Sequence, residues 1–145
     1  MRNIAVMISG RDQLSAACHK TLSTASDVRI VEQIGPERKA ELATAVARRR
    51  PRILLIDIAF VRDSRYSLIT ILRRLSPKTR FILVCERAAR SEIMDALSHG
   101  VLGYLETKDI DKFLVKLVRA VNAGEAWVPR HIISLMAKRL VELSA

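Results

Sequence analysis

Cysteines are few and long apolar runs are missing in this 145-residue chain. The two isolated cysteines, Cys18 and Cys85, have no metal-ligand spacing, so we expect reduced thiols and neither a disulfide framework nor a zinc site. No apolar run approaches the roughly 18 residues of a membrane span, and the first residues do not follow the pattern of a signal peptide. The sequence therefore predicts a soluble, cytoplasmic protein that does not associate with membranes.

Aromatic residues are also scarce, at 4% of the chain, although 50% of its residues are hydrophobic. Lys and Arg outnumber Asp and Glu by 25 to 15, which gives a formal net charge of +10. This charge would suit nucleic acid, an acidic partner or simple solubility. The densest cluster, residues 48–50 with Arg52, ends a predicted helix, where cations complement the helix dipole, and no aromatic side chains interleave with it to stack on bases. The charge alone gives little support for direct nucleic-acid contact.

Short apolar runs alternate with segments of helical periodicity. Strands are predicted near residues 4–8, 28–34, 53–56, 81–84 and 101–105, and helices after Gly10, over about 36–49, through 68–75, through 93–97 and, most clearly, over 110–121. Strands that alternate with helices predict an α/β fold, a doubly wound parallel sheet covered on both faces. A further helix over 130–144 has more apolar residues than one helix can hide, which indicates packing against its own domain, a second copy or another domain.

The most informative stretch is the apolar strand at residues 53–56, which ends at Asp57. In an open α/β sheet the ligand crevice lies beyond the carboxyl ends of the strands, so Asp57 is a candidate site residue. The alternative is an aspartate that only begins a loop or caps the following helix.

Three stretches of sequence resemble receiver domains of response regulators, and together they extend the resemblance over about residues 3–123. Residues 54–58 (LLIDI) resemble the strand that presents the phospho-accepting aspartate, and residues 96–105 (ALSHGVLGYL) resemble the passage from the fourth helix into the fifth strand. Residues 118–127 (VRAVNAGEAW) resemble the exit segment of the NarL/FixJ (LuxR-type) subfamily, in which a DNA-binding domain usually follows. The resemblance implies a flavodoxin-like, five-stranded sheet of order 2-1-3-4-5 with an extra C-terminal helix. Residues 1–124 would be the receiver-like domain, and residues 125–145 the linker and C-terminal helix.

The resemblance also implies which residues would carry a phosphoryl switch. Asp57 takes the phospho-acceptor position, and Tyr104 takes the position of the switch aromatic. The acidic pair that holds Mg²⁺ in such domains maps onto Ser9 and Gly10. The hydroxyl that reports phosphorylation maps onto Cys85, and the lysine that clamps the phosphoryl group maps onto Thr107, next to Lys108. Because these positions have lost their usual groups, we expect an atypical receiver, or pseudo-receiver. It would bind no cofactor and no Mg²⁺, and ordinary phosphoryl transfer would not switch it.

A regulatory function follows from this resemblance, and an enzyme is not expected because no nucleophile and base pair is evident. We expect a two-component-type regulator of transcription that forms a homodimer or docks a sensor kinase or another regulatory protein, with DNA contacted only through an output domain outside this sequence. The dimer or partner face would include Tyr104 together with Ile93, Ala96, Phe113 and Lys116. The alternatives are a small-molecule or redox sensor, with Cys85 either reactive or a buried inert thiol, and a receiver still phosphorylated at Asp57.

Overall fold

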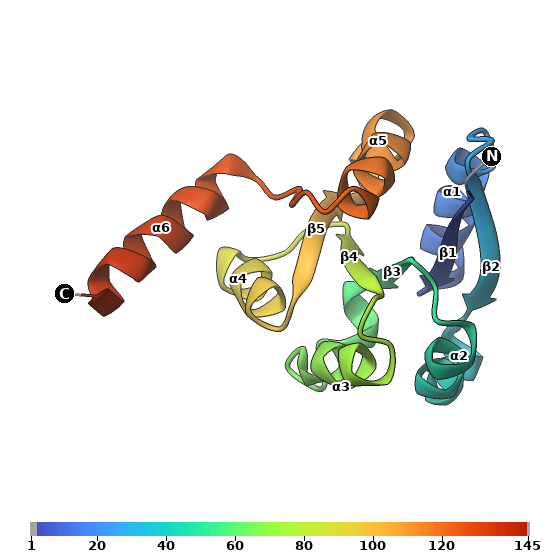
Figure 1. Cartoon of the computed structure of the whole chain (residues 1–145), viewed down its shortest axis with the longest axis horizontal. Coiled ribbons are helices and arrows are strands. Elements are labelled where there is room, and N and C mark those ends of the chain that lie inside the picture. The colour runs from blue at the N-terminus through green and yellow to red at the C-terminus, as the bar shows by residue number, and fades with distance from the viewer. Residues whose placement is uncertain (1–2, 145) are drawn as a thin grey trace.

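The computed structural model describes residues 3–144, which form a five-stranded parallel sheet of order β2-β1-β3-β4-β5. The strands span Ile4–Ser9 (β1), Val28–Ile34 (β2), Ile53–Asp57 (β3), Arg80–Cys85 (β4) and Val101–Glu106 (β5). The helices span Asp12–Leu22 (α1), Leu42–Arg49 (α2), Ser67–Leu75 (α3), Arg90–Ser98 (α4), Ile110–Asn122 (α5) and Arg130–Ser144 (α6). Helices α1 and α5 lie on one face of the sheet and α2, α3 and α4 on the other, whereas α6 projects away from the domain (Figure 1). The predicted doubly wound fold, strand order and extra C-terminal helix are confirmed.

The core has two apolar layers, one on each face of the sheet. Every residue of β3 is buried, with Ile53 and Leu55 in the layer under α1 and α5, and Leu54 and Ile56 in the opposite layer. A strand covered on both faces needs apolar residues at consecutive positions, which explains why this run does not alternate with polar residues. The burial of β3 fixes the position of Asp57 at its carboxyl end.

Helix α2 begins later than the sequence pattern predicts. Residues Pro36–Glu41 form a 3-10 helix, and the α-helix starts only at Leu42. Pro36 suits the first turn of a helix, but none of the residues from Pro36 to Glu41 is buried, so no tertiary packing favours the α-helical form there. The prediction of one helix from residue 36 to residue 49 is therefore wrong at its start.

The segment after α5 is tied to the edge of the sheet. The backbone N–H of Trp127 donates to the carbonyl of Leu102 at 2.8 Å, and the N–H of Tyr104 donates to the carbonyl of Trp127 at 2.9 Å. Helix α6 then packs on the domain through Ile132, which is fully buried. Leu135 is partly buried against the same core, and the remaining large apolar side chains of α6 are exposed, namely Ile133, Met136, Leu140, Val141 and Leu143. Within residues 3–144, no helix combines the length and the hydropathy needed to cross a membrane.

Candidate functional site

Asp57 lies at the carboxyl end of β3 and is fully buried, against the turn that joins β1 to α1. The backbone of this turn passes so close that a Cβ atom placed on Gly10 would lie 2.5 Å from Cβ of Asp57. Real Cβ atoms essentially never approach this closely, so any side chain at residue 10 would force the backbone to shift. Glycine at this position permits the close approach, and a carboxylate does not fit there.

The Asp57 carboxylate is bound by Arg11, the first residue after this turn. The guanidinium donates from Nε to Oδ2 at 2.8 Å and from Nη2 to Oδ1 at 3.2 Å, and the backbone N–H of Arg11 donates to Oδ2 at 3.0 Å. The N–H of Ala59 donates to Oδ1 at 3.0 Å, so Asp57 also caps the turn that follows β3. The hydrogen bond to Asp57 raises the pKa of Arg11. Both carboxylate oxygens are thus held by fixed donors and one fixed positive charge.

The residues around Asp57 do not fit the magnesium site that the receiver resemblance implies. Ser9 is buried and its hydroxyl donates to the carbonyl of Leu55 at 3.0 Å, and Gly10 has no side chain. Nowhere in residues 3–144 do three His, Cys, Asp or Glu side chains gather closely enough to hold one metal ion. Mg²⁺ requires several oxygen ligands in near-octahedral geometry. The guanidinium of Arg11 takes up the carboxylate oxygens that such an ion would need.

Cys85 and Tyr104 form a buried pair on the neighbouring strands β4 and β5. The thiol of Cys85 donates to the Tyr104 hydroxyl at 3.4 Å, and that hydroxyl donates to Oε2 of Glu106 at 3.5 Å. Burial raises the pKa of Cys85 and that of Tyr104. A neutral, buried thiol is a poor nucleophile, which agrees with an inert Cys85 rather than a reactive redox site. The Tyr104 side chain is directed inward, with 6% of the residue exposed.

Thr107 and Lys108 follow β5, and neither supplies a cation to Asp57. Thr107 lines a cavity of about 230 Å³ together with Arg11, Glu86 and Ile110. Lys108 is 76% exposed and its Nζ lies 3.4 Å from a carboxylate oxygen of Glu106. Among residues 3–144, the one salt bridge to Asp57 comes from Arg11.

Solved structures of receiver domains share this architecture, although no protein-family model and no curated protein sequence matches the chain. The isolated receiver domain of RcsB from Salmonella enterica serovar Typhimurium superposes with a TM-score of 0.81 at 18% identity, covering 93% of this chain and 99% of that one. The receiver domain of the putative response regulator NarL from Mycobacterium tuberculosis gives 0.65 at 18% identity, covering 82% and 98%. A longer RcsB structure from Salmonella typhimurium, described in terms of DNA interaction, gives 0.80 at 18% identity, covering 94% and 70%. The chain has the receiver fold.

A second polar cluster joins the loop after Asp57 to the start of α4. Glu92 accepts hydrogen bonds from Nε of Arg62 at 2.8 Å and from the hydroxyl of Tyr66 at 2.7 Å. Its other oxygen accepts from the N–H of Ala89 at 3.1 Å, which satisfies a free donor at the start of α4. We call Arg62, Tyr66 and Glu92 the α4 latch, because they hold α4 against the loop that follows β3.

The α4 latch predicts an acid-sensitive contribution to stability. The hydrogen bond from Arg62, with that from Tyr66, lowers the pKa of Glu92 to about 2. A depressed carboxylate pKa stabilises the fold fully above the unfolded value of roughly 4.3, and this contribution is lost as the pH falls toward 2. Because Glu92 is partly exposed, solvent screening reduces the contribution to about 1 kcal/mol. We expect Glu92→Gln to lower the free energy of unfolding by about that amount at pH 7 and by about half as much at pH 3, as measured by urea denaturation.

The residues expected on a dimer or partner face divide into two groups. Ile93 is 4% exposed and Ala96 is 1% exposed, so both belong to the core under α4 and do not present an outer surface. Phe113 is 37% exposed, with its ring centroid 6.2 Å from that of Trp127, and Lys116 is exposed on α5. The partner face that the family resemblance implies stays a prediction, with Phe113 and Lys116 as its exposed members in this structure.

The sequence pattern gave no role to Arg11, Arg62 or Glu92, although these residues make the strongest polar contacts at the carboxyl edge of the sheet. For Arg11 a signal exists, because it directly follows the turn after β1, and β1 and β3 are neighbours whose carboxyl ends lie together. A cation at that position opposite a strand-end aspartate suggests an ion pair.

Proposed function

We propose that this receiver is a regulatory module that signals through protein contacts and is not switched by Mg²⁺-dependent phosphorylation of Asp57. The observation that carries the proposal is the Arg11–Asp57 ion pair, in which both carboxylate oxygens are already engaged. A phosphoryl group would have to displace these donors, and it would add about two negative charges. One half-exposed guanidinium would remain to balance them, and within residues 3–144 no three His, Cys, Asp or Glu side chains gather to hold a metal ion.

The test is incubation of the full chain with acetyl phosphate, and separately with beryllofluoride, in the presence of Mg²⁺. We expect no added phosphoryl mass in intact-protein mass spectrometry and no fluorine resonance from a bound beryllofluoride. A receiver with intact acidic pair and lysine serves as the positive control under the same conditions. Modification that disappears in Asp57→Asn would contradict the proposal and support a receiver still phosphorylated at Asp57.

The proposed setting is two-component-type control of transcription, supported by the resemblance of residues 118–127 to NarL/FixJ exit segments and by the similarity in fold to RcsB. Partners would be a second copy, a sensor kinase or another regulatory protein, and DNA would be contacted by an output domain. The α4 latch supports a constitutive state, because α4 is held to the loop after Asp57 by an ion pair that does not depend on phosphorylation.

The surface that best suits contact with a second copy is the groove between α6 and the domain. This groove has a volume of about 490 Å³ and is lined by Leu97, Val101 and Val128 from the domain and by Ile133, Met136 and Leu140 from α6. Three of these α6 side chains are among the large exposed apolar residues of the chain. A twofold contact would bury the same row of side chains from both copies, since the carboxyl-terminal part of α6 projects away from the domain (Figure 1).

A further inference from the structure

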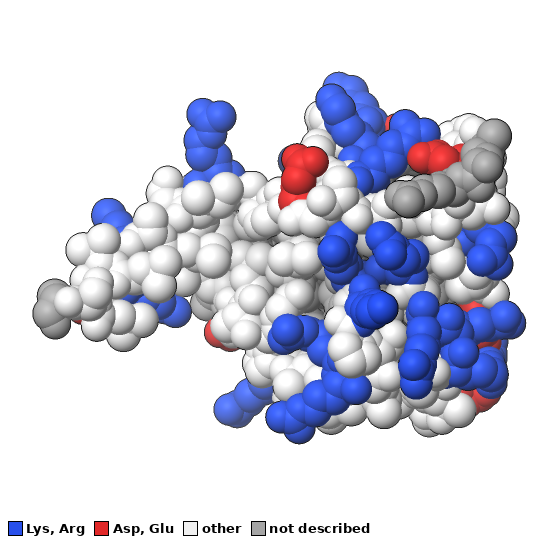
Figure 2. Space-filling view, in the orientation of Figure 1, with Lys and Arg blue, Asp and Glu red and all other residues white. Residues whose placement is uncertain are grey.

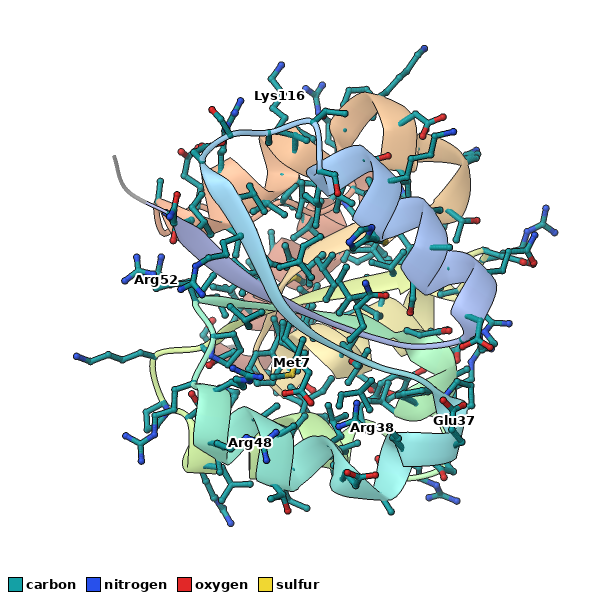
Figure 3. The ribbon with its side chains drawn as sticks, turned by 90° about the vertical axis from the view of Figure 1, so that its right-hand side faces the viewer. Met7, Glu37, Arg38, Arg48, Arg52 and Lys116 are labelled. Carbon is teal, nitrogen blue, oxygen red and sulfur yellow. The ribbon has the colours of Figure 1, made fainter. Side chains whose placement is uncertain are left out.

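The amino ends of the central strands, opposite Asp57, carry an excess of positive charge. Residues 42–56 and 66–85, which lead into β3 and β4, contain eight Lys and Arg residues and no Asp or Glu. Figure 2 shows Lys and Arg side chains gathered over one face of the molecule, with few acidic side chains among them. Figure 3 places Arg52 and Arg48 on the side where β1 begins, away from Glu37 near the end of β2. The positive charge therefore lies at the edge of the sheet opposite the Asp57 site.

Some of these cations have structural partners. Arg48 and Arg49 form ion pairs with Glu32, at 3.2 and 3.0 Å. Arg73 donates to the carbonyl of His99, and Arg80 donates to the carbonyls that end α5. These contacts stabilise the fold and limit the freedom of these side chains to bind anything else.

We call the other four cations the basic edge: Arg50, Arg52, Arg74 and Lys78. Arg50 and Arg52 each donate one hydrogen bond from Nε, to the carbonyl of Ala47 at 3.3 Å and to Oδ1 of Asn122 at 3.1 Å. All four are exposed, and none forms an ion pair with another residue in the described range 3–144. The two loops that carry three of them are in contact. The Thr79 hydroxyl donates to the carbonyl of Pro51 at 2.6 Å, and the N–H of Arg80 donates to the carbonyl of Arg52 at 2.9 Å. The charges thus lie on one continuous surface.

We propose that the basic edge binds the phosphate backbone of duplex DNA without sequence preference. Arginine side chains match phosphate oxygens with paired donors, and several of them on one surface release counterions from a duplex. Residues 50–52 and 76–80 contain no aromatic side chain, which disfavours single strands bound by base stacking. They also contain no large apolar side chain to form the core of a protein interface. The surface is independent of Asp57 and lies on the receiver itself, not on an output domain.

The test is fluorescence anisotropy of a labelled duplex of about 20 base pairs with the full chain at several salt concentrations. Four phosphate contacts predict a slope of log K against log salt of about −3 to −4, so affinity should fall about a hundredfold between roughly 50 and 200 mM NaCl. We expect the variant with Arg50→Gln, Arg52→Gln, Arg74→Gln and Lys78→Gln to bind at least about tenfold more weakly near 50 mM, with a slope close to zero.

A matched control variant has Arg65, Arg87, Arg90 and Lys112 each changed to Gln. These four cations are also exposed and without an ion pair in the described residues, but they follow the carboxyl ends of the strands. Both variants carry the same net charge, so a general charge effect would weaken them equally and would overturn the proposal. Failure of the wild-type chain to bind the duplex near 50 mM NaCl would also overturn it. Tighter, edge-dependent binding of polyglutamate than of the duplex would assign the surface to an acidic protein instead. Circular dichroism confirms that each variant is folded before binding is compared.

Discussion

Replacing Arg11 by alanine is expected to lower the free energy of unfolding by about 3 kcal/mol. Asp57 is fully buried, and the substitution removes its counter-charge and two of its four hydrogen bonds. The cost lies at the lower end of the range for a broken buried pair, because Arg11 itself is half-exposed and water can reach the vacated position. Urea denaturation followed by circular dichroism measures the change.

A double-mutant cycle separates the energy of the Arg11–Asp57 ion pair from the other effects of Arg11→Ala. Asp57→Asn removes the buried charge, so Arg11→Ala should cost much less in that background than in the wild type, and the difference is the coupling energy of the pair. Arg65→Ala serves as the control, because Arg65 is exposed and has no ion pair within residues 3–144; it should change stability by less than about 0.5 kcal/mol. Equal costs in both backgrounds would show that the guanidinium does not stabilise the buried carboxylate.

The second large effect is expected at α6. We predict a dimer in solution and its loss when Met136 and Leu140 are both changed to Glu, because these side chains are exposed and line the groove between α6 and the domain. Two carboxylates in an apolar contact would raise the dissociation constant by at least about a hundredfold, through the cost of burying unpaired charge. Sedimentation equilibrium over a range of protein concentrations measures the change.

The matched control adds the same two charges to another side of the helix. His131→Glu with Ser134→Glu places two carboxylates at exposed positions that do not line the groove. This control should dissociate with the wild-type constant. A wild-type chain that remains monomeric at high concentration would show that the groove takes a different partner, and equal effects of both variants would show that net charge, not the groove, governs association.

The fold was predictable because its determinants are local and repeated. The run at residues 53–56 is apolar at consecutive positions, as a strand covered on both faces must be, and the periodicity of residues 110–121 matches α5 closely. The 3-10 start of α2 was not predictable from Pro36, because its form depends on whether neighbouring residues find a surface to pack on. The burial of Ile93 and Ala96 beneath α4 likewise depends on tertiary packing, which sets the two layers of the core.

The sequence predicted the position of the candidate site at Asp57. For its surroundings, the sequence predicted which groups are missing but not which group binds the carboxylate. The mapping of Ser9 and Gly10 showed that an acidic pair is missing, but the group bound to the carboxylate is the next residue, Arg11. The path of the turn at Gly10 brings that guanidinium onto Asp57, and no sequence motif describes this path. Glu92 was missed because its partners Arg62 and Tyr66 lie about 30 residues away in the chain and meet it only after α3 has packed.

The short backbone pairing of Trp127 with β5 attaches the start of α6 to the sheet. The backbone of Trp127 is hydrogen-bonded on both sides, to Leu102 and to Tyr104, so the root of α6 is fixed to the strand that carries the buried tyrosine. A helix of 15 residues is about 22 Å long, so a tilt of about 10° at its root moves its far end by about 4 Å. A change in packing around Tyr104 that tilted α6 would therefore move the far end of the helix, and any partner bound there, by several ångströms.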